Sequence, residues 1–149
     1  DGLAAANAVR DQQVDETLDR VVEANTLLSG LGFESGGVAV AHGVAQTCTV
    51  FPHVHDRYLH GEMVAVGTLI QLALESNLDE AFKVAEFFAQ VGLPVNLEQL
   101  SLDIQSGSTL STLIEGVLAW PFTSNMPFSV EDGALKEAIR DFDEMQISS

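Results

Sequence analysis

The chain has 149 residues, enough for one domain with a substantial core and short for two. It carries 6 Lys and Arg against 22 Asp and Glu, a formal net charge of −16. This charge argues against nucleic acid and against anionic membrane surfaces as partners, because binding to either needs clustered Lys and Arg. No apolar run approaches the roughly 20 residues that span a bilayer, and the first residues lack the basic stretch of a signal peptide.

Cys48 is the single cysteine, so an internal disulfide is excluded and a reducing, cytoplasmic compartment is expected. No basic neighbour in sequence would lower the pKa of its thiol, so we interpret Cys48 as a core residue. The chain also lacks a Gly-x-Ser-x-Gly elbow, a Walker loop and a dinucleotide-binding Gly-x-Gly-x-x-Gly motif. We therefore expect no cofactor-binding residues for a dinucleotide within this sequence.

The N-terminal part predicts one helix from about residue 3 to residue 28. Apolar residues, including Val14 and Leu18, recur there on one stripe, with acidic residues mostly elsewhere. The Ser-Gly-Leu-Gly sequence at 29–32 is expected to break this helix.

The next run, 38–45, is apolar and rich in Ala and Gly, which favours a tightly packed buried helix over a buried strand. Ser35 is its candidate N-cap. Residues 50–59 predict a loop, and residues 61–75 predict a second apolar helix. Together with the downstream segments, these patterns predict a single all-α domain.

The downstream segments repeat the alternation of helices and short connections. Asp79 is expected to cap a helix that carries Phe82, Ala85 and Phe88 on one face and ends at Gly92. Further segments are predicted as follows: a short connecting or helical piece over 97–102, a helix over 108–118, a loop over 121–127 and an amphipathic helix over 130–145.

The four histidines, His42, His53, His55 and His60, lie within nineteen residues. His42 sits in the apolar run, where a neutral imidazole needs a hydrogen-bond partner or a metal. Neutral imidazole is a good ligand for zinc or iron, and two such groups on adjacent helices can converge on one ion. The residues alone leave three alternatives open: a buried His42 bonded to a backbone carbonyl, exposed loop histidines at 53 and 55, or adventitious metal capture by His53, His55 and His60.

The stretch 23–37, which contains Ser29-Gly30-Leu31-Gly32-Phe33, resembles the bacterial glycerol dehydrogenases of the iron-containing (group III) alcohol dehydrogenase family. The likeness continues through Ala41-His42 and through 58–65, which contains His60-Gly61-Glu62. It extends from about Val14 to Pro127 and includes the segments 67–69, 91–94 and 125–127.

The resemblance implies an all-α, bundle-like domain over residues 1–149, corresponding to the C-terminal half of a dehydroquinate-synthase-like fold. It further implies that an α/β domain, absent from this chain, binds NAD. The family holds its metal, usually zinc, with one Asp and two His. His42 and His60 match the two histidines, whereas the Asp is expected upstream of this chain. We expect no catalytic residue beyond these ligands, and we expect Phe33 in the substrate pocket.

Two departures from the family pattern stand out. Ala45-Gln46-Thr47 replaces a His-Asn-Gly run that can face the cofactor, and the loop 52–59 is about one residue longer than usual. The first departure weakens any prediction of cofactor contacts. The second could shift His60, although the helix that follows it still has a regular pattern.

The implied reaction is hydride transfer between NAD and a secondary alcohol, glycerol giving dihydroxyacetone, with Zn²⁺ as Lewis acid. We expect the isolated chain to bind zinc weakly and to be inactive, because two imidazoles form only part of a catalytic zinc site. The alternative is a non-enzymatic helical module, or a fragment that self-associates through an exposed apolar face. The family's enzymes are often oligomeric, so a homo-oligomer is also expected.

Overall fold

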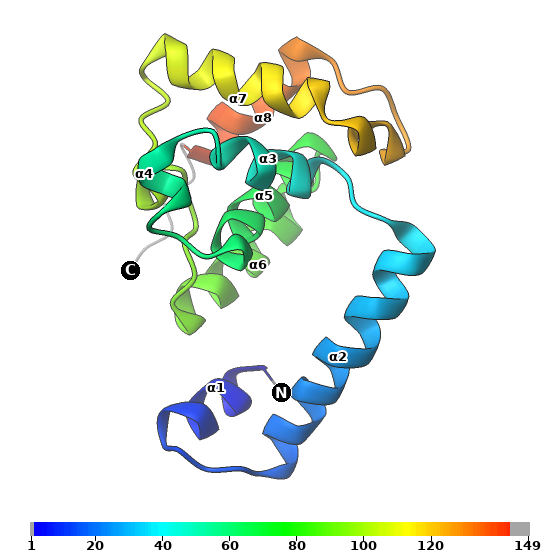
Figure 1. Cartoon of the computed structure of the whole chain (residues 1–149), viewed down its shortest axis with the longest axis vertical. Coiled ribbons are helices and arrows are strands. Elements are labelled where there is room, and N and C mark those ends of the chain that lie inside the picture. The colour runs from blue at the N-terminus through cyan, green and yellow to red at the C-terminus, as the bar shows by residue number, and fades with distance from the viewer. Residues whose placement is uncertain (1, 144–149) are drawn as a thin grey trace. The chain divides into compact units, whose positions relative to one another are not determined.

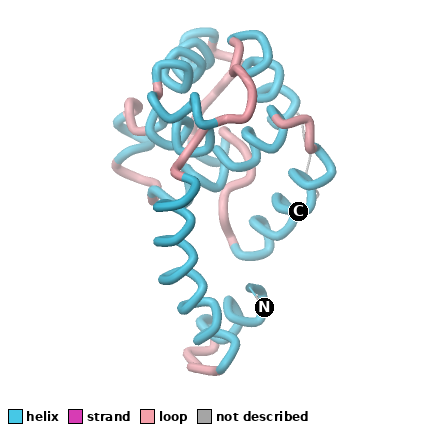
Figure 2. The backbone as a smooth tube through the Cα atoms, turned by 90° about the vertical axis from the view of Figure 1, so that its right-hand side faces the viewer, coloured by secondary structure: helices cyan, strands magenta, loops and turns pink. Residues whose placement is uncertain are grey.

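A computed structural model of the chain describes residues 2–143. Every regular element in this range is helical, as Figure 2 shows, so the all-α prediction is confirmed. The elements are α1 (Gly2–Arg10), α2 (Glu16–Gly36), α3 (Val40–Cys48), α4 (Pro52–His55), α5 (His60–Leu74), α6 (Leu78–Val91), η1 (Glu98–Leu100), α7 (Gly107–Ala119), η2 (Pro121–Asn125) and α8 (Asp132–Asp143). No helix within this range is long and apolar enough to cross a membrane.

The chain divides into two compact units, Asp1–Gly37 and Val38–Ser149. The expectation of one metal-binding domain over residues 1–149 accordingly stays a prediction. Figure 1 shows α1 and α2 of the first unit at the blue end of the colour range.

The N-terminal unit contains two helices where the sequence predicted one. The carboxylate of Asp15 caps α2 by accepting a hydrogen bond from the Leu18 N–H at 2.8 Å. The predicted break at 29–32 is wrong, because α2 continues to Gly36 and ends at Gly37, whose φ is 68°. A glycine inside a helix costs only about 0.5–1 kcal/mol relative to alanine. The two glycines at 30 and 32 therefore cost too little to end the helix.

Helices α3 and α5 form the centre of the second unit, and α7 and α8 pack around them (Figure 1). The predicted buried helix in the 38–45 run is confirmed as α3, which buries Val44, Ala45 and Cys48. Its N-cap position is Ala39, whereas Ser35 lies inside α2, so the Ser35 cap was predicted wrongly. The apolar helix predicted over 61–75 is confirmed as α5.

The remaining elements follow the predicted order with local corrections. The predicted loop at 50–59 contains the single turn α4, and Asn77 rather than Asp79 occupies the N-cap position of α6. Phe82 is 43% exposed, because α6 packs through Ala81 and Ala85 instead. The helix ends as predicted at Gly92, whose φ is +83°.

Elements after α6 also match the pattern. The helix predicted over 108–118 is confirmed as α7, and the short piece and the loop around it contain η1 and η2. The helix predicted over 130–145 is confirmed as α8 up to Asp143, and its last two residues lie outside the described range.

Candidate metal centre

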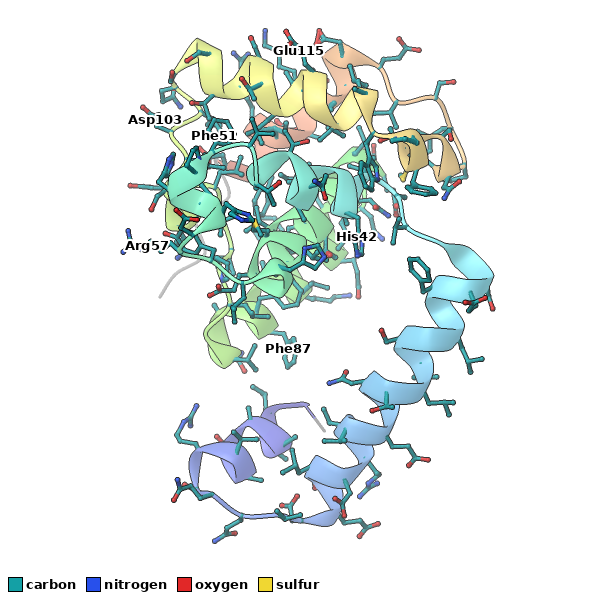
Figure 3. All side chains as sticks on the ribbon, in the orientation of Figure 1. His42, Phe51, Arg57, Phe87, Asp103 and Glu115 are labelled. Atoms are coloured by element: carbon teal, nitrogen blue, oxygen red, sulfur yellow. The ribbon has the colours of Figure 1, made fainter. Side chains whose placement is uncertain are left out.

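The side chains of His42 on α3 and His60 on α5 lie against each other. Their ring centroids are 5.6 Å apart and the ring planes are inclined by 53°. His42 is half-buried and His60 is exposed, so the pair has one side open to solvent. Figure 3 labels His42 beside the ribbon of α5. The structure therefore brings together the two histidines that the family resemblance singles out.

The start of α5 is fixed by its own first turn. Leu59 has extended backbone at the N-cap position, and its N–H donates a 2.6 Å hydrogen bond to Oε2 of Glu62. This is the carboxylate half of a capping box, and a negative charge at this end of a helix is favourable. Because His60 is the first residue of α5, the Glu62 contact also fixes the backbone that carries its imidazole.

The start of α3 depends on a residue from another helix. Ala39, at the N-cap position, makes no side-chain cap. The N–H of Ala41 donates instead to Oε1 of Gln71 at 3.0 Å, and Nε2 of Gln71 donates to Oε1 of Glu75 at 3.0 Å. Gln71 was not predicted from the sequence as a residue of this site. Its only signal was its position eleven residues after His60, which places both on one face of α5.

Burial lowers the pKa of His42 from its ordinary value of 6.5, and the charge of His60 lowers it further. Both effects disfavour the imidazolium form. His42 is therefore neutral at pH 7, and a neutral imidazole nitrogen is the form that binds a metal ion.

The other two histidines take no part in this pair. Nε2 of His53 donates to the backbone carbonyl of Ser101 at 3.1 Å, and His55 is exposed on α4. Across residues 2–143, no group of three or more His, Cys, Asp or Glu side chains is placed to hold a metal ion. The structure thus offers no site of the kind that His53, His55 and His60 would share.

Trp120 packs on α3 at Gly43 and was not predicted from the sequence as a residue of interest. Its ring packs on Gly43, where an added Cβ would lie 3.2 Å from Cδ1 of Trp120. The indole N–H of Trp120 is buried and has no hydrogen-bond partner within the described residues. A buried donor without a partner is uncommon in folded proteins.

Phe33, the predicted pocket residue, lies on α2 in the N-terminal unit and is 64% exposed. Its role stays a prediction.

Comparison with known proteins yields a consistent set of relatives. A glycolaldehyde reductase of Halobacterium salinarum is 40% identical over 146 residues, which are 97% of this chain and 40% of the relative. A glycerol dehydrogenase of Thermotoga maritima is 44% identical over 115 residues, 76% of this chain and 31% of the relative. No protein-family profile matches the chain.

Solved structures give the same result. The crystal structure of a probable glycerol dehydrogenase from Sinorhizobium meliloti matches with a TM-score of 0.87 and 35% identity, over 96% of this chain and 41% of that one. These similarities place the chain in a family of oxidoreductases, of which it matches a helical region. The chain belongs to the glycerol dehydrogenase family, and the predicted correspondence to the C-terminal helical half of the family fold is confirmed. It spans about two fifths of the length of the Halobacterium relative.

Proposed function

We propose that this chain is the helical, metal-binding part of an NAD-linked glycerol dehydrogenase, with His42 and His60 as two of the protein ligands of a zinc ion. The observation that carries the proposal is the contact between these two imidazoles, which come from different helices and lie eighteen positions apart in sequence. Membership of the glycerol dehydrogenase family supports the choice of reaction.

The donor set fits the metal. Zinc binds imidazole nitrogen at about 2.0–2.1 Å in tetrahedral geometry. Two imidazoles bound to the same zinc ion therefore have ring centroids about 5 Å apart. The observed separation of 5.6 Å is close to that value. The neutral state of His42 removes the proton that would compete with the metal.

When bound, zinc would act as a Lewis acid that stabilises negative charge on the alcohol oxygen. The residues of this chain would hold the metal ion: His42 and His60 supply nitrogen donors, and Glu62 fixes the start of the helix that carries His60. In this proposal a carboxylate ligand and the NAD-binding domain are supplied by the rest of the enzyme. Hydride transfer is then the chemistry of the nicotinamide.

The proposed substrate class is a small polyol, with glycerol as its representative. The relative that aligns with 97% of the chain bears the name glycolaldehyde reductase, which favours a hydroxyaldehyde as the second candidate. Glycerol and glycolaldehyde both carry oxygen atoms on adjacent carbons. One oxygen-binding metal can therefore serve either substrate, in the oxidative or the reductive direction.

The isolated 149-residue chain is proposed to bind zinc weakly and to have no NAD-linked activity of its own. A catalytic zinc normally has three protein ligands, and the described residues bring two together. The intact enzyme is proposed to be a cytoplasmic homo-oligomer. The rival function, a non-enzymatic module that self-associates, predicts a mass by light scattering that rises with concentration even when zinc and NAD are absent.

A chimera tests the proposed reaction directly. The matching 115-residue segment of the Thermotoga glycerol dehydrogenase is replaced by the corresponding segment of this chain. The folded, zinc-loaded chimera should reduce NAD with glycerol, and His42→Ala or His60→Ala should remove that activity. A folded, zinc-loaded chimera that oxidises no polyol and reduces no glycolaldehyde would contradict the proposal.

A further inference from the structure

The side chain of Gln71 connects the two helices that carry the histidine pair. We propose that Gln71 is a positioning residue: its amide fixes the N-terminus of α3 on α5 and thereby holds His42 against His60. This inference rests on the proposed metal site and assigns to it a residue that binds neither the metal nor the substrate.

The N-terminus of α3 has no side-chain cap of its own. The N–H groups of His42 and Gly43 both donate to the carbonyl of Ala39 at 3.1 Å. The N–H of Ala41 is one of the donors that a helix leaves unpaired in its first turn. Because Ala39 has no side-chain acceptor, the 3.0 Å bond to Gln71 replaces the missing cap.

Glu75 orients the side-chain amide of Gln71. Nε2 of Gln71 donates to the carboxylate of Glu75 one turn later on α5. An amide that donates to a carboxylate on one side must present its oxygen on the other, which is the side where Ala41 lies. Glu75 is exposed, whereas Gln71 is partly buried, so the charge stays in water while the neutral amide faces α3.

The hydrogen bond between Ala41 and Gln71 lies next to the proposed metal ligand in the chain. Ala41 immediately precedes His42, and Ala41 also contacts Gly67 on α5 through its carbonyl. The Gly67 contact limits how closely the helices approach, but it does not fix rotation or sliding of α3. The Gln71 bond is directional, so it supplies the constraint on sliding that sets where the His42 imidazole lies relative to His60.

Three variants of the full 149-residue chain separate positioning from general stability. Gln71→Met keeps the side-chain length and removes the acceptor. The double variant Gln71→Glu with Glu75→Gln exchanges the amide and the carboxylate, so it preserves both the hydrogen-bond chain and the net charge. Ile70→Val, a buried change on the same helix, lowers stability without touching the Ala41 N–H.

The readouts are hydrogen exchange of the Ala41 amide, the NMR cross-relaxation between the two imidazole rings, zinc affinity by calorimetry, and melting temperature. We expect Gln71→Met to speed Ala41 exchange, to weaken the ring–ring signal and to lower zinc affinity at least fivefold. The exchanged double variant should restore all three readouts. Ile70→Val should lower the melting temperature and leave the three readouts unchanged.

Two results would overturn the inference: a Gln71→Met chain with wild-type ring–ring signal and zinc affinity, or an Ile70→Val chain that loses affinity to the same degree. Failure of the proposed metal site looks different, because His42→Ala would then bind zinc as the wild type does. In that case the ring–ring signal of Gln71→Met, measured without metal, still decides whether Gln71 positions His42.

Discussion

Gly67 on α5 lies directly against the backbone carbonyl of Ala41 on α3, and a Cβ at this position would overlap that oxygen. We expect Gly67→Ala to push the two helices apart and to lower the free energy of unfolding by about 1–3 kcal/mol, the usual range for overpacking. Zinc affinity should fall as well, because the displacement acts next to His42. Denaturant unfolding and calorimetry measure the two effects.

Gly61→Ala is the matched control on the same helix, because a Cβ there meets no atom within 4 Å. Alanine is the better helix former by about 0.5–1 kcal/mol, so this variant should be neutral or slightly more stable. Equal stability of Gly67→Ala and Gly61→Ala would show that α3 and α5 are not in close contact at Ala41.

The net charge of −16 predicts a protein that is stabilised by salt. Ion pairs such as Arg20–Glu16 and Lys83–Glu80 join exposed side chains within one helix, and such pairs contribute little. Repulsion among the acidic residues therefore dominates, and it is screened over about 3 Å at 1 M ionic strength. The melting temperature should rise as NaCl increases from about 0.05 to 1 M, and a fall over this range would contradict the prediction.

The helices could be predicted from sequence where local pattern determines structure. The Ala and Gly content of 38–45 indicated a tightly packed helix. Neighbouring helices do approach α3 closely, since a Cβ at Gly67 would overlap Ala41 and a Cβ at Gly116 would overlap Thr47. The break at 29–32 was predicted wrongly, because the cost of glycine in a helix is too small to end one. An end requires a backbone change, which occurs at Gly37.

The candidate site could be predicted from the sequence only in part. The spacing of His42 and His60 corresponds to no local motif, so their pairing was predicted from family resemblance and is explained by the crossing of α3 and α5. Gln71 and Trp120 were missed because their significance is tertiary. A hydrogen bond across thirty residues and a buried indole N–H correspond to no local sequence motif.

Protonation of His42 should reduce stability at acid pH. The folded state lowers the pKa of His42 from 6.5, through burial first and the charge of His60 second. Between that lowered pKa and 6.5 the unfolded chain binds more protons, so stability is fully present above 6.5 and is lost as the pH falls below it. Unfolding by urea on both sides of pH 6.5 should show a smaller decline for His42→Gln than for the wild type. An identical decline in both proteins would contradict this assignment.

Cys48 should be unreactive in the folded protein. Burial raises the pKa of its thiol to about 12, so the thiolate that reacts with alkylating reagents is scarce at pH 8. We expect iodoacetamide to label Cys48 slowly in buffer and rapidly in urea, at a rate that follows unfolding. Rapid labelling of the folded chain would show that α3 does not bury this thiol.

Zinc binding to the full 149-residue chain tests the pairing of His42 and His60 most directly. Calorimetry at neutral pH compares the wild type with His42→Ala, His60→Ala and the exposed control His55→Ala. The pairing predicts one weak zinc site, at least a tenfold loss of affinity in each of the first two variants, and wild-type affinity in His55→Ala. Wild-type affinity in His42→Ala and His60→Ala, or a loss confined to His55→Ala, would contradict it.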